Sequence, residues 1–221
     1  MKVIAIIPAY HEASVIAGVV RKTVSFVDEV VVVDDGSEDR TGETARAAGA
    51  RVYTHVLNRG LGAALSTGMA AALKRGADVI ITLDADGQHD PVEIPNFVRA
   101  INEKKVDAVI GSRFLGKTEM PALRRVYNRI GNLLTYLLFG IRTTDSQSGF
   151  RAFTRRGAQR LELKTNRMEV SSEFLKEIHD KQISFCEIPC SVKYTDYSMS
   201  KGQSFGVGIS TAFKLVLRRL M

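Results

Sequence analysis

Carboxylates follow several apolar runs of this sequence, and the closest pair is Asp84 and Asp86, with Gln88 two residues further on. Carboxylates brought into one crevice repel one another and resist ionisation unless a cation or a ligand compensates them. Mg2+ and Mn2+ prefer such oxygen ligands and complete their coordination with phosphate oxygens and water. An isolated Asp-x-Asp pair could equally be a solvated turn, but here two other acidic loops accompany it. We therefore expect Asp84, Asp86 and Gln88 to hold Mg2+ or Mn2+.

The positions of these carboxylates predict a sheet that gathers distant segments. Short β-branched runs alternate with helical patterns, which is typical of an α/β fold with a mainly parallel sheet and helices on both faces. The expected strands are 3–7, 30–33, 52–56, 79–83 and 108–110, and the expected helices are 14–27, 41–48, 62–74 and 91–103. Ligands of such sheets bind at the carboxyl ends of the strands. Glu12, Asp35 and Asp86 follow expected strands, so we expect them to line one crevice.

The regular alternation ends near residue 113. The rest of the chain predicts an irregular C-terminal half, with strands at 184–188 and 191–194 and a helix at 170–180. Glu169 and Glu173 would then lie one helical turn apart, where they would line or support the site. The total length of 221 residues fits one domain.

The composition narrows the class of protein. Lys and Arg number 31 against 24 Asp and Glu, a net charge of +7 that favours polyanionic partners such as phosphorylated ligands, nucleic acid or an anionic membrane. Two cysteines, Cys186 and Cys190, are too few for a disulfide scaffold or a four-ligand zinc site, and we expect both to be core or half-buried residues. The apolar run before Pro8 is too short for a signal peptide, so we expect a cytoplasmic protein.

Two common nucleotide-binding motifs fit this sequence poorly. Gly60 and Gly62 begin a G-x-G-x-x-L stretch after the third expected strand, whereas a dinucleotide fingerprint follows the first strand and ends in a small residue. We expect these glycines to shape a loop and let a helix pack, with a phosphate-facing loop as the alternative. The G-x-x-x-x-G-K-[ST] pattern of P-loop hydrolases is absent from the sequence.

Six motifs in order suggest a family. IPAYHE, VVVDDGSEDRT, NRGLGAALSTG, LDADGQHDP, GSRF and DSQSGFRAF resemble glycosyltransferase family 2, particularly its dolichyl-phosphate mannose synthase branch, over residues 3 to about 201. The resemblance implies a GT-A fold, a nucleotide-diphosphate sugar donor, a divalent cation and inverting transfer to a polyprenyl (dolichyl) phosphate. It also implies one domain, 1–221, with a nucleotide-sugar-binding half at 1–113 and an acceptor-binding half with amphipathic helices at 114–221.

The resemblance assigns the donor to residues spread over these motifs. Those expected to bind the nucleotide sugar are Pro8, Tyr10, Glu12, Val33, Asp35, Asp84, Ala85, Asp86, Arg113 and Lys201. One departure matters: six residues before Lys201 the family has an arginine, where this chain has Thr195. Lys193 is a candidate substitute. This departure leaves open whether the donor is GDP-mannose, UDP-glucose or UDP-N-acetylglucosamine.

The chemistry of such a transfer assigns catalytic roles. Breaking the bond between sugar C1 and phosphate places negative charge on the departing diphosphate, so a metal at Asp86 and the cation of Arg113 would act where charge develops. Asp145 is a third candidate: it could be a general base if the acceptor were a hydroxyl, or it could shape its loop or orient an arginine.

A phosphate acceptor is already largely anionic at neutral pH, so it needs positioning by cations more than deprotonation. The candidate acceptor-phosphate residues are Arg124, Arg125, Arg129 and Arg151, with a solvated basic face as the alternative. The apolar segment 130–141 has twelve residues, too few to span a bilayer as a helix. Its leucines could be core, but apolar faces beside arginines, here and at 205–221, favour peripheral attachment to an anionic membrane surface at the cytosolic leaflet.

Two other functions stay open. One is a family 2 transferase with a saccharide or other soluble acceptor, which would use Asp145 as base. The other is a non-catalytic nucleotide or nucleic-acid binding module. We expect no nucleic-acid partner, because the inferred crevice is acidic and the sequence has no stripe of interleaved aromatic and basic residues.

Overall fold

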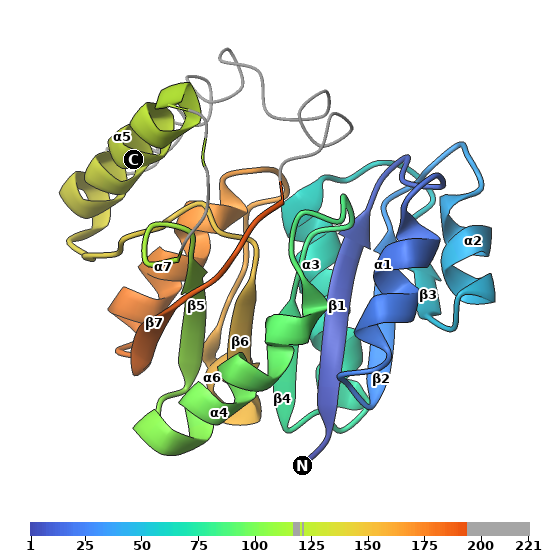
Figure 1. Cartoon of the computed structure of the whole chain (residues 1–221), viewed down its shortest axis with the longest axis horizontal. Coiled ribbons are helices and arrows are strands. Elements are labelled where there is room, and N and C mark those ends of the chain that lie inside the picture. Colours follow the sequence, from blue (N-terminus) through green and yellow to red (C-terminus); the bar gives the residue numbers. More distant parts are fainter. Residues whose placement is uncertain (117–119, 121, 194–221) are drawn as a thin grey trace.

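A seven-stranded sheet forms the centre of the molecule, in the order β3-β2-β1-β4-β6-β5-β7 (Figure 1). The computed structural model describes residues 1–116, 120 and 122–193. The strands are β1 (Val3–Ala9), β2 (Glu29–Asp34), β3 (Arg51–Thr54), β4 (Val79–Thr82), β5 (Ala108–Ser112), β6 (Arg151–Thr154) and β7 (Phe185–Pro189). The expected α/β fold with a mainly parallel sheet is confirmed.

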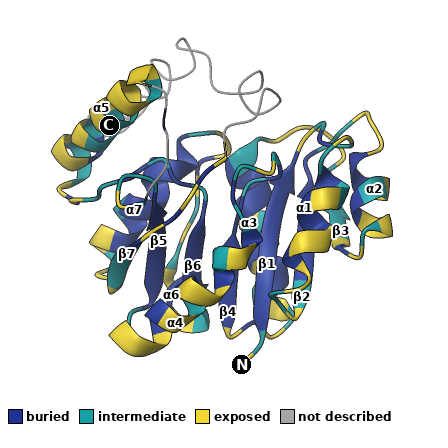
Figure 2. Cartoon of the chain, viewed as in Figure 1, coloured by how far each residue is buried: buried dark blue, intermediate teal, exposed yellow. Residues whose placement is uncertain are grey.

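Helices cover both faces of this sheet. They are α1 (Ile16–Thr23), α2 (Thr41–Ala47), α3 (Leu61–Lys74), the 3-10 helix η1 (Pro91–Glu93), α4 (Ile94–Lys104), α5 (Ala122–Phe139), α6 (Arg155–Arg160) and α7 (Val170–Asp180). Buried side chains of α1, α2 and α4 form one apolar cluster with the sheet, and those of α3, α6 and α7 form the other. Because β1, β4 and β5 are covered on both sides, every one of their residues is buried (Figure 2).

Two features of the second half differ from the expected elements. β6 runs antiparallel between β4 and β5, in a segment where the sequence predicted no strand. The strand expected at 191–194 is reduced, over the described residues, to a single bridge between His89 and Val192. β7 falls close to the predicted 184–188 and pairs in parallel with β5. The antiparallel β6 matters for function because it carries the 143–150 loop to the end of the sheet where β4 and β5 terminate.

Candidate active site

The site is built at the carboxyl ends of β1, β2, β4 and β5. β1 lies between β2 and β4, with Pro8 opposite Val33, and the backbone N–H of Asp35 donates to the carbonyl of Ala9 at 2.8 Å. The loops after these strands are therefore neighbours. The charge of Glu12, after β1, contributes to raising the pKa of Asp86, after β4. The structure thus places the acidic loops after β1, β2 and β4 beside one another, and the shared donor-binding crevice stays a prediction.

Asp84 and Asp86 differ in their surroundings although they are two residues apart. Burial and the charge of Asp84 raise the pKa of Asp86 to about 6. Burial acts in the same direction on Asp84, but the hydrogen bond from His89 and the charges of Arg113 and Arg151 outweigh it and hold the Asp84 pKa below its usual range. His89 Nε2 lies 3.2 Å from Asp84 Oδ2. Asp84 therefore stays ionised, and Asp86 takes up a proton at a higher pH than an ordinary aspartate does. A cation beside both carboxylates would favour the ionised form of Asp86.

This donor set fits a divalent cation that keeps part of its coordination for other ligands. In the described part of the chain, no group of three or more His, Cys, Asp or Glu side chains could hold a metal ion by itself. Asp84 and Asp86 offer carboxylate oxygens, and Gln88 follows in the same turn, its backbone N–H donating to Asp86 Oδ1 at 3.0 Å. Two carboxylates with few further protein ligands are typical of Mg2+ sites completed by substrate phosphates.

Gly149 lets the strand β6 approach the acidic pair. A Cβ atom on Gly149 would lie 2.5 Å from both carboxylate oxygens of Asp84, closer than atoms can pack. The carbonyl of Gly149 accepts a 2.8 Å hydrogen bond from Thr82 Oγ1 at the end of β4. The glycine of the SGF sequence is therefore required by the contact between the 143–150 loop and the acidic loop.

Arg113 follows β5 and is held by Asp145. Its Nη2 lies 2.6 Å from Asp145 Oδ1, its Nε lies 2.7 Å from Oδ2, and its backbone N–H donates to Oδ2 at 3.0 Å. Asp145 is 0% exposed. A fully buried carboxylate with both oxygens bound to an arginine is poorly placed to take a proton from an acceptor. Of the roles considered for Asp145, the geometry therefore favours orienting an arginine over acting as a general base.

Asp35 lies in a buried polar cluster after β2. His55 Nδ1 is 2.6 Å from Asp35 Oδ1, and His55 Nε2 is 2.9 Å from Thr67 Oγ1 on α3. The backbone N–H groups of Arg59 and Gly60 also donate to the Asp35 carboxylate. Because a carboxylate is an acceptor only, His55 must carry its proton on Nδ1 to donate to Asp35. This cluster fixes the Asp35 side chain.

The other residues assigned to the donor lie around this cluster with different exposures. Tyr10 is exposed and stacks on His11, with ring centroids 4.1 Å apart, and the backbone N–H of Glu12 donates to Thr41 Oγ1. Val33 is fully buried in the core on the α3 side, so its side chain faces away from solvent. Pro8 and Ala85 are also buried. Lys201 and Thr195 lie outside the described residues.

Gly60 and Gly62 serve packing at the start of α3. A Cβ on Gly62 would meet the carbonyl oxygen of Thr165 at 1.9 Å, and one on Gly60 would meet that of Asn166 at 2.3 Å. The Asn166 carbonyl accepts from the backbone N–H groups of Gly62 and Ala63, so the first turn of α3 is already capped. Glu173 supports this loop by accepting from the backbone N–H groups of Lys164 and Thr165 and from the Thr165 hydroxyl. These contacts favour the packing role expected for the glycines over a phosphate-binding one.

The four arginines assigned to the acceptor phosphate divide into two groups. Arg124, Arg125 and Arg129 lie on α5, where Arg125 and Arg129 are exposed. Arg151, on β6, is only 2% exposed, so it does not share the exposed position of the α5 arginines with which it was expected to bind the acceptor phosphate. Its Nη2 donates to the carbonyl of Ser171, and its guanidinium lies over the Phe174 ring, 4.6 Å from the centroid. Burial lowers the pKa of Arg151 to about 10, against the opposing charges of Asp84 and Asp145.

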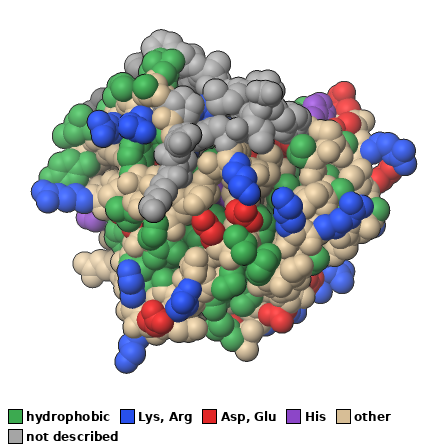
Figure 3. Space-filling model, in the orientation of Figure 1, with side chains coloured by type: hydrophobic (Ala, Val, Ile, Leu, Met, Phe, Trp, Pro, Cys, Tyr) green, Lys and Arg blue, Asp and Glu red, His purple; other side chains and the backbone are tan. Residues whose placement is uncertain are grey.

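Helix α5 carries an exposed apolar face next to these arginines (Figure 3). Within this helix only Thr135 is buried. Its exposed large apolar residues are Leu123, Val126, Tyr127, Ile130, Leu133, Tyr136 and Leu137. Among the described residues, no helix combines the length and apolar character required to cross a membrane. The C-terminal segment 205–221, also expected to be amphipathic, lies outside the described residues.

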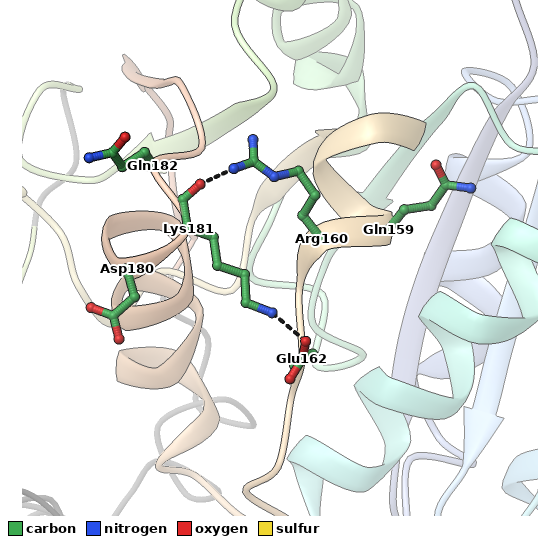
Figure 4. Close-up of a pocket in the computed structure, with 6 residues that line it drawn as sticks. All are labelled: Gln159, Arg160, Glu162, Asp180, Lys181 and Gln182. Carbon is green, nitrogen blue, oxygen red and sulfur yellow. Dashed lines mark hydrogen bonds and ion pairs between the residues drawn. The ribbon is translucent and has the colours of Figure 1, made fainter.

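A second, polar hollow lies between α6 and the end of α7 (Figure 4). Its lining residues are Gln159, Arg160, Glu162, Asp180, Lys181 and Gln182. Lys181 Nζ lies 2.6 Å from Glu162 Oε1, and Arg160 donates to the carbonyl of Lys181. These charges compensate one another, and none of the lining residues belongs to the crevice around Asp84.

Comparison with known proteins decides the family. The sequence model of the family described as glycosyl transferase family 2 matches residues 4–161. The chain belongs to glycosyl transferase family 2. This family 2 glycosyltransferase is 32% identical over 238 residues to the UDP-N-acetylglucosamine–dolichyl-phosphate N-acetylglucosaminyltransferase of Methanococcus voltae, covering 97% of this chain and 95% of the relative. It is 36% identical over 176 residues to the polyprenol monophosphomannose synthase of Mycolicibacterium smegmatis, covering 73% of this chain and 65% of that one.

A solved structure supports the fold of this family 2 glycosyltransferase. The glucosyl-3-phosphoglycerate synthase of Mycobacterium tuberculosis, in complex with Mn2+, UDP-glucose and phosphoglyceric acid, matches it with a TM-score of 0.76. The identity is 20%, over 99% of this chain and 78% of the synthase. The GT-A fold and the family implied by the six motifs are therefore confirmed.

Sequence reasoning missed several residues that hold the site of this glycosyltransferase together. His55 and His89 are the partners of Asp35 and Asp84, and Asn132 and Glu187 bind the loop before Gly149. His89 had a visible signal, because it belongs to the same LDADGQHDP motif as Asp84. The others lie far along the chain from the residues they contact, so spacing gave no indication of their role.

Proposed function

We propose that this family 2 glycosyltransferase moves a sugar, with inversion at C1, from a nucleotide-diphosphate sugar to a polyprenyl phosphate. The observation that carries the proposal is the meeting of Asp84 and Asp86 with the Arg113–Asp145 pair beside a helix that bears Arg124, Arg125 and Arg129. The two aspartates and the Arg113–Asp145 pair suit a diphosphate and its cation. The arginines of the helix suit an anionic acceptor next to an apolar surface.

On the donor side, Asp84, Asp86 and Gln88 would hold Mg2+ or Mn2+. Such a cation neutralises charge on the diphosphate and stabilises it as a leaving group. Arg113 adds a second positive charge where negative charge develops, and Asp145 keeps its guanidinium aimed. Asp35, fixed by His55 and two backbone N–H groups, would bind the nucleoside together with Tyr10 and Glu12 of the loop after β1.

On the acceptor side, the reaction needs no strong base. A phosphate monoester has a second pKa near 6 and is largely dianionic at neutral pH. One of its oxygens forms the new bond to C1 while the bond from C1 to the donor phosphate breaks and its electron pair leaves with the nucleoside diphosphate. We assign Arg124, Arg125 and Arg129 to positioning the acceptor phosphate. This assignment agrees with the buried, fully bonded state of Asp145.

We further propose that the enzyme attaches peripherally to the cytosolic leaflet of a membrane through α5. The support is the exposed apolar face of α5 beside exposed arginines, an arrangement by which helices bind anionic lipid surfaces. A lipid acceptor would then present its phosphate at the arginines while its chain stays in the bilayer.

The test is an assay with Mg2+ or Mn2+, a short polyprenyl phosphate and a panel of labelled UDP- and GDP-sugars. We expect lipid-soluble label from one donor, with transfer falling by roughly 10²-fold or more in Asp86→Ala. Asp78→Ala is the matched control, because Asp78 lies at the opposite end of β4 and bonds Lys2 at the surface. Label transferred to free sugars or phosphoglycerate but not to lipid would overturn the acceptor. Transfer unchanged by a chelator and by Asp86→Ala would overturn the metal site.

A further inference from the structure

One side-chain amide on α5 bonds both peptide groups that flank Asp145. Asn132 Nδ2 donates to the carbonyl oxygen of Thr144 at 2.5 Å, and Asn132 Oδ1 accepts from the backbone N–H of Ser146 at 2.8 Å. An amide has one donor end and one acceptor end, so this arrangement mimics the pairing of a neighbouring strand. Asp145 is the residue between these two bonds.

The opposite side of the same loop is also held. Glu187 on β7 accepts from the backbone N–H and the hydroxyl of Thr144 and from the hydroxyl of Thr143. Thr144 therefore has its N–H fixed by β7 and its carbonyl fixed by α5. With these bonds the loop can place Asp145 in only a narrow range of positions.

The orientation of the Arg113 side chain depends on the position of Asp145. Asp145 binds the Arg113 guanidinium through both oxygens and the Arg113 backbone through one. A bidentate arginine–carboxylate pair fixes the direction of the guanidinium as well as its distance. Displacement of Asp145 would therefore rotate Arg113 away from the acidic pair, whose Asp84 it reaches by its charge.

We propose that Asn132 is a positioning residue that aligns Arg113 through Asp145, and that it couples the placement of α5 to the catalytic geometry. The proposal rests on the function proposed above for Arg113. Asn132 is suited to this role because α5 is little buried, with Thr135 its only buried residue, and the Asn132 amide joins the helix to both peptide groups beside Asp145. Seating α5 on its substrate surface would thereby set Arg113 for transfer.

The experiment compares Asn132→Ala and Asn132→Asp with Asn128→Ala. Asn128 lies one turn earlier on α5 and donates to Met120 Sδ, away from the loop. We expect kcat to fall about 10- to 100-fold in both Asn132 variants, because a shift of about 1 Å in a positioning group costs up to that much. KM for the donor should change less than about threefold, since Asp35 and the acidic pair are untouched. Asn132→Asp should not rescue, because a carboxylate oxygen would face the Thr144 carbonyl.

Hydrogen–deuterium exchange gives a readout that does not depend on transfer. The backbone N–H of Ser146 loses its acceptor in Asn132→Ala, so we expect the peptide that contains it to exchange faster, together with the peptide that contains the Arg113 N–H. Asn128→Ala should leave both unchanged at a similar melting temperature. Equal kcat in the wild type and the Asn132 variants would overturn the inference, as would unchanged exchange at Ser146. A wild type that transfers no sugar to polyprenyl phosphate would instead overturn the proposed function, while the exchange result would still report on Asn132.

Discussion

Helices α4 and α5 have the same amphipathic pattern in sequence and opposite environments in the structure. α4 packs against β5, β6 and β7 and buries Ile94, Phe97, Ala100 and Ile101. α5 buries Thr135 alone and is largely exposed (Figure 2), with Leu123, Leu133 and Leu137 on its surface. An amphipathic pattern therefore indicates that a helix has an apolar face, but it does not indicate whether that face packs against the sheet or stays on the surface.

The sharpest test of this difference replaces one large apolar residue in each helix by alanine. Phe97 is 0% exposed and stacks on Phe150, with ring centroids 4.2 Å apart, so Phe97→Ala should lower the free energy of unfolding by about 3–5 kcal/mol. Leu137 is 67% exposed, and Leu137→Ala should change the free energy of unfolding by less than about 0.5 kcal/mol. Denaturant unfolding of both variants provides the measurement. A cost at Leu137 close to that at Phe97 would show that another part of the chain covers α5.

The fold was predictable where local pattern and burial agree. The central residues of β1, β2 and β4 are covered on both faces, so they form apolar, largely β-branched runs from which the strands could be predicted. β6 was missed because its four residues, RAFT, follow an irregular polar loop and include Arg151, whose burial is compensated by a carbonyl and an aromatic ring of α7. Such compensation by a distant element leaves no local signal.

The site was predictable to a similar extent. Asp84, Asp86 and Arg113 lie at strand ends, where topology alone brings them together. The roles of Asp145 and Arg151 depend on side-chain direction: Asp145 points to Arg113 instead of an acceptor, and Arg151 points into the core. Asn132 looked like an ordinary polar residue of an amphipathic helix, because its partners Thr144 and Ser146 follow twelve and fourteen residues later on a loop.

A second test asks what covers the α5 face. Leu133→Ser combined with Leu137→Ser should weaken binding to anionic vesicles by about 100-fold, because each leucine contributes roughly 1.5 kcal/mol when it leaves water. Co-sedimentation with phosphatidylserine-containing vesicles provides the measurement. Val92→Ser is the matched control, since Val92 is 57% exposed and lies on η1, which packs against α1 and α4. Binding unaffected by the leucine changes would contradict the membrane role of α5.

The prediction with the smallest expected effect tests whether water is excluded from the α4 side of the sheet. Cys190 packs in the cluster that contains Phe97, and burial, assisted by the charges of Asp145 and Glu93, raises the pKa of its thiol from 9.0 to about 12. A thiol whose pKa is raised by folding contributes stability that is fully present below pH 9, the unfolded value, and is lost as the pH rises towards 12.

The loss follows from ionisation of the unfolded chain, since at pH 10 the unfolded thiol is mostly ionised while the folded one is neutral. Relative to pH 8, this difference removes about 1.4 kcal/mol of stability at pH 10. Cys190→Ala should lower stability by a constant amount at pH 7 and 8, and the gap to the wild type should narrow by that figure at pH 10. Urea unfolding at each pH measures it. A stability difference between the wild type and Cys190→Ala that stays constant with pH would mean that water reaches Cys190. The α4 side of the sheet would then exclude water less completely than its buried residues indicate.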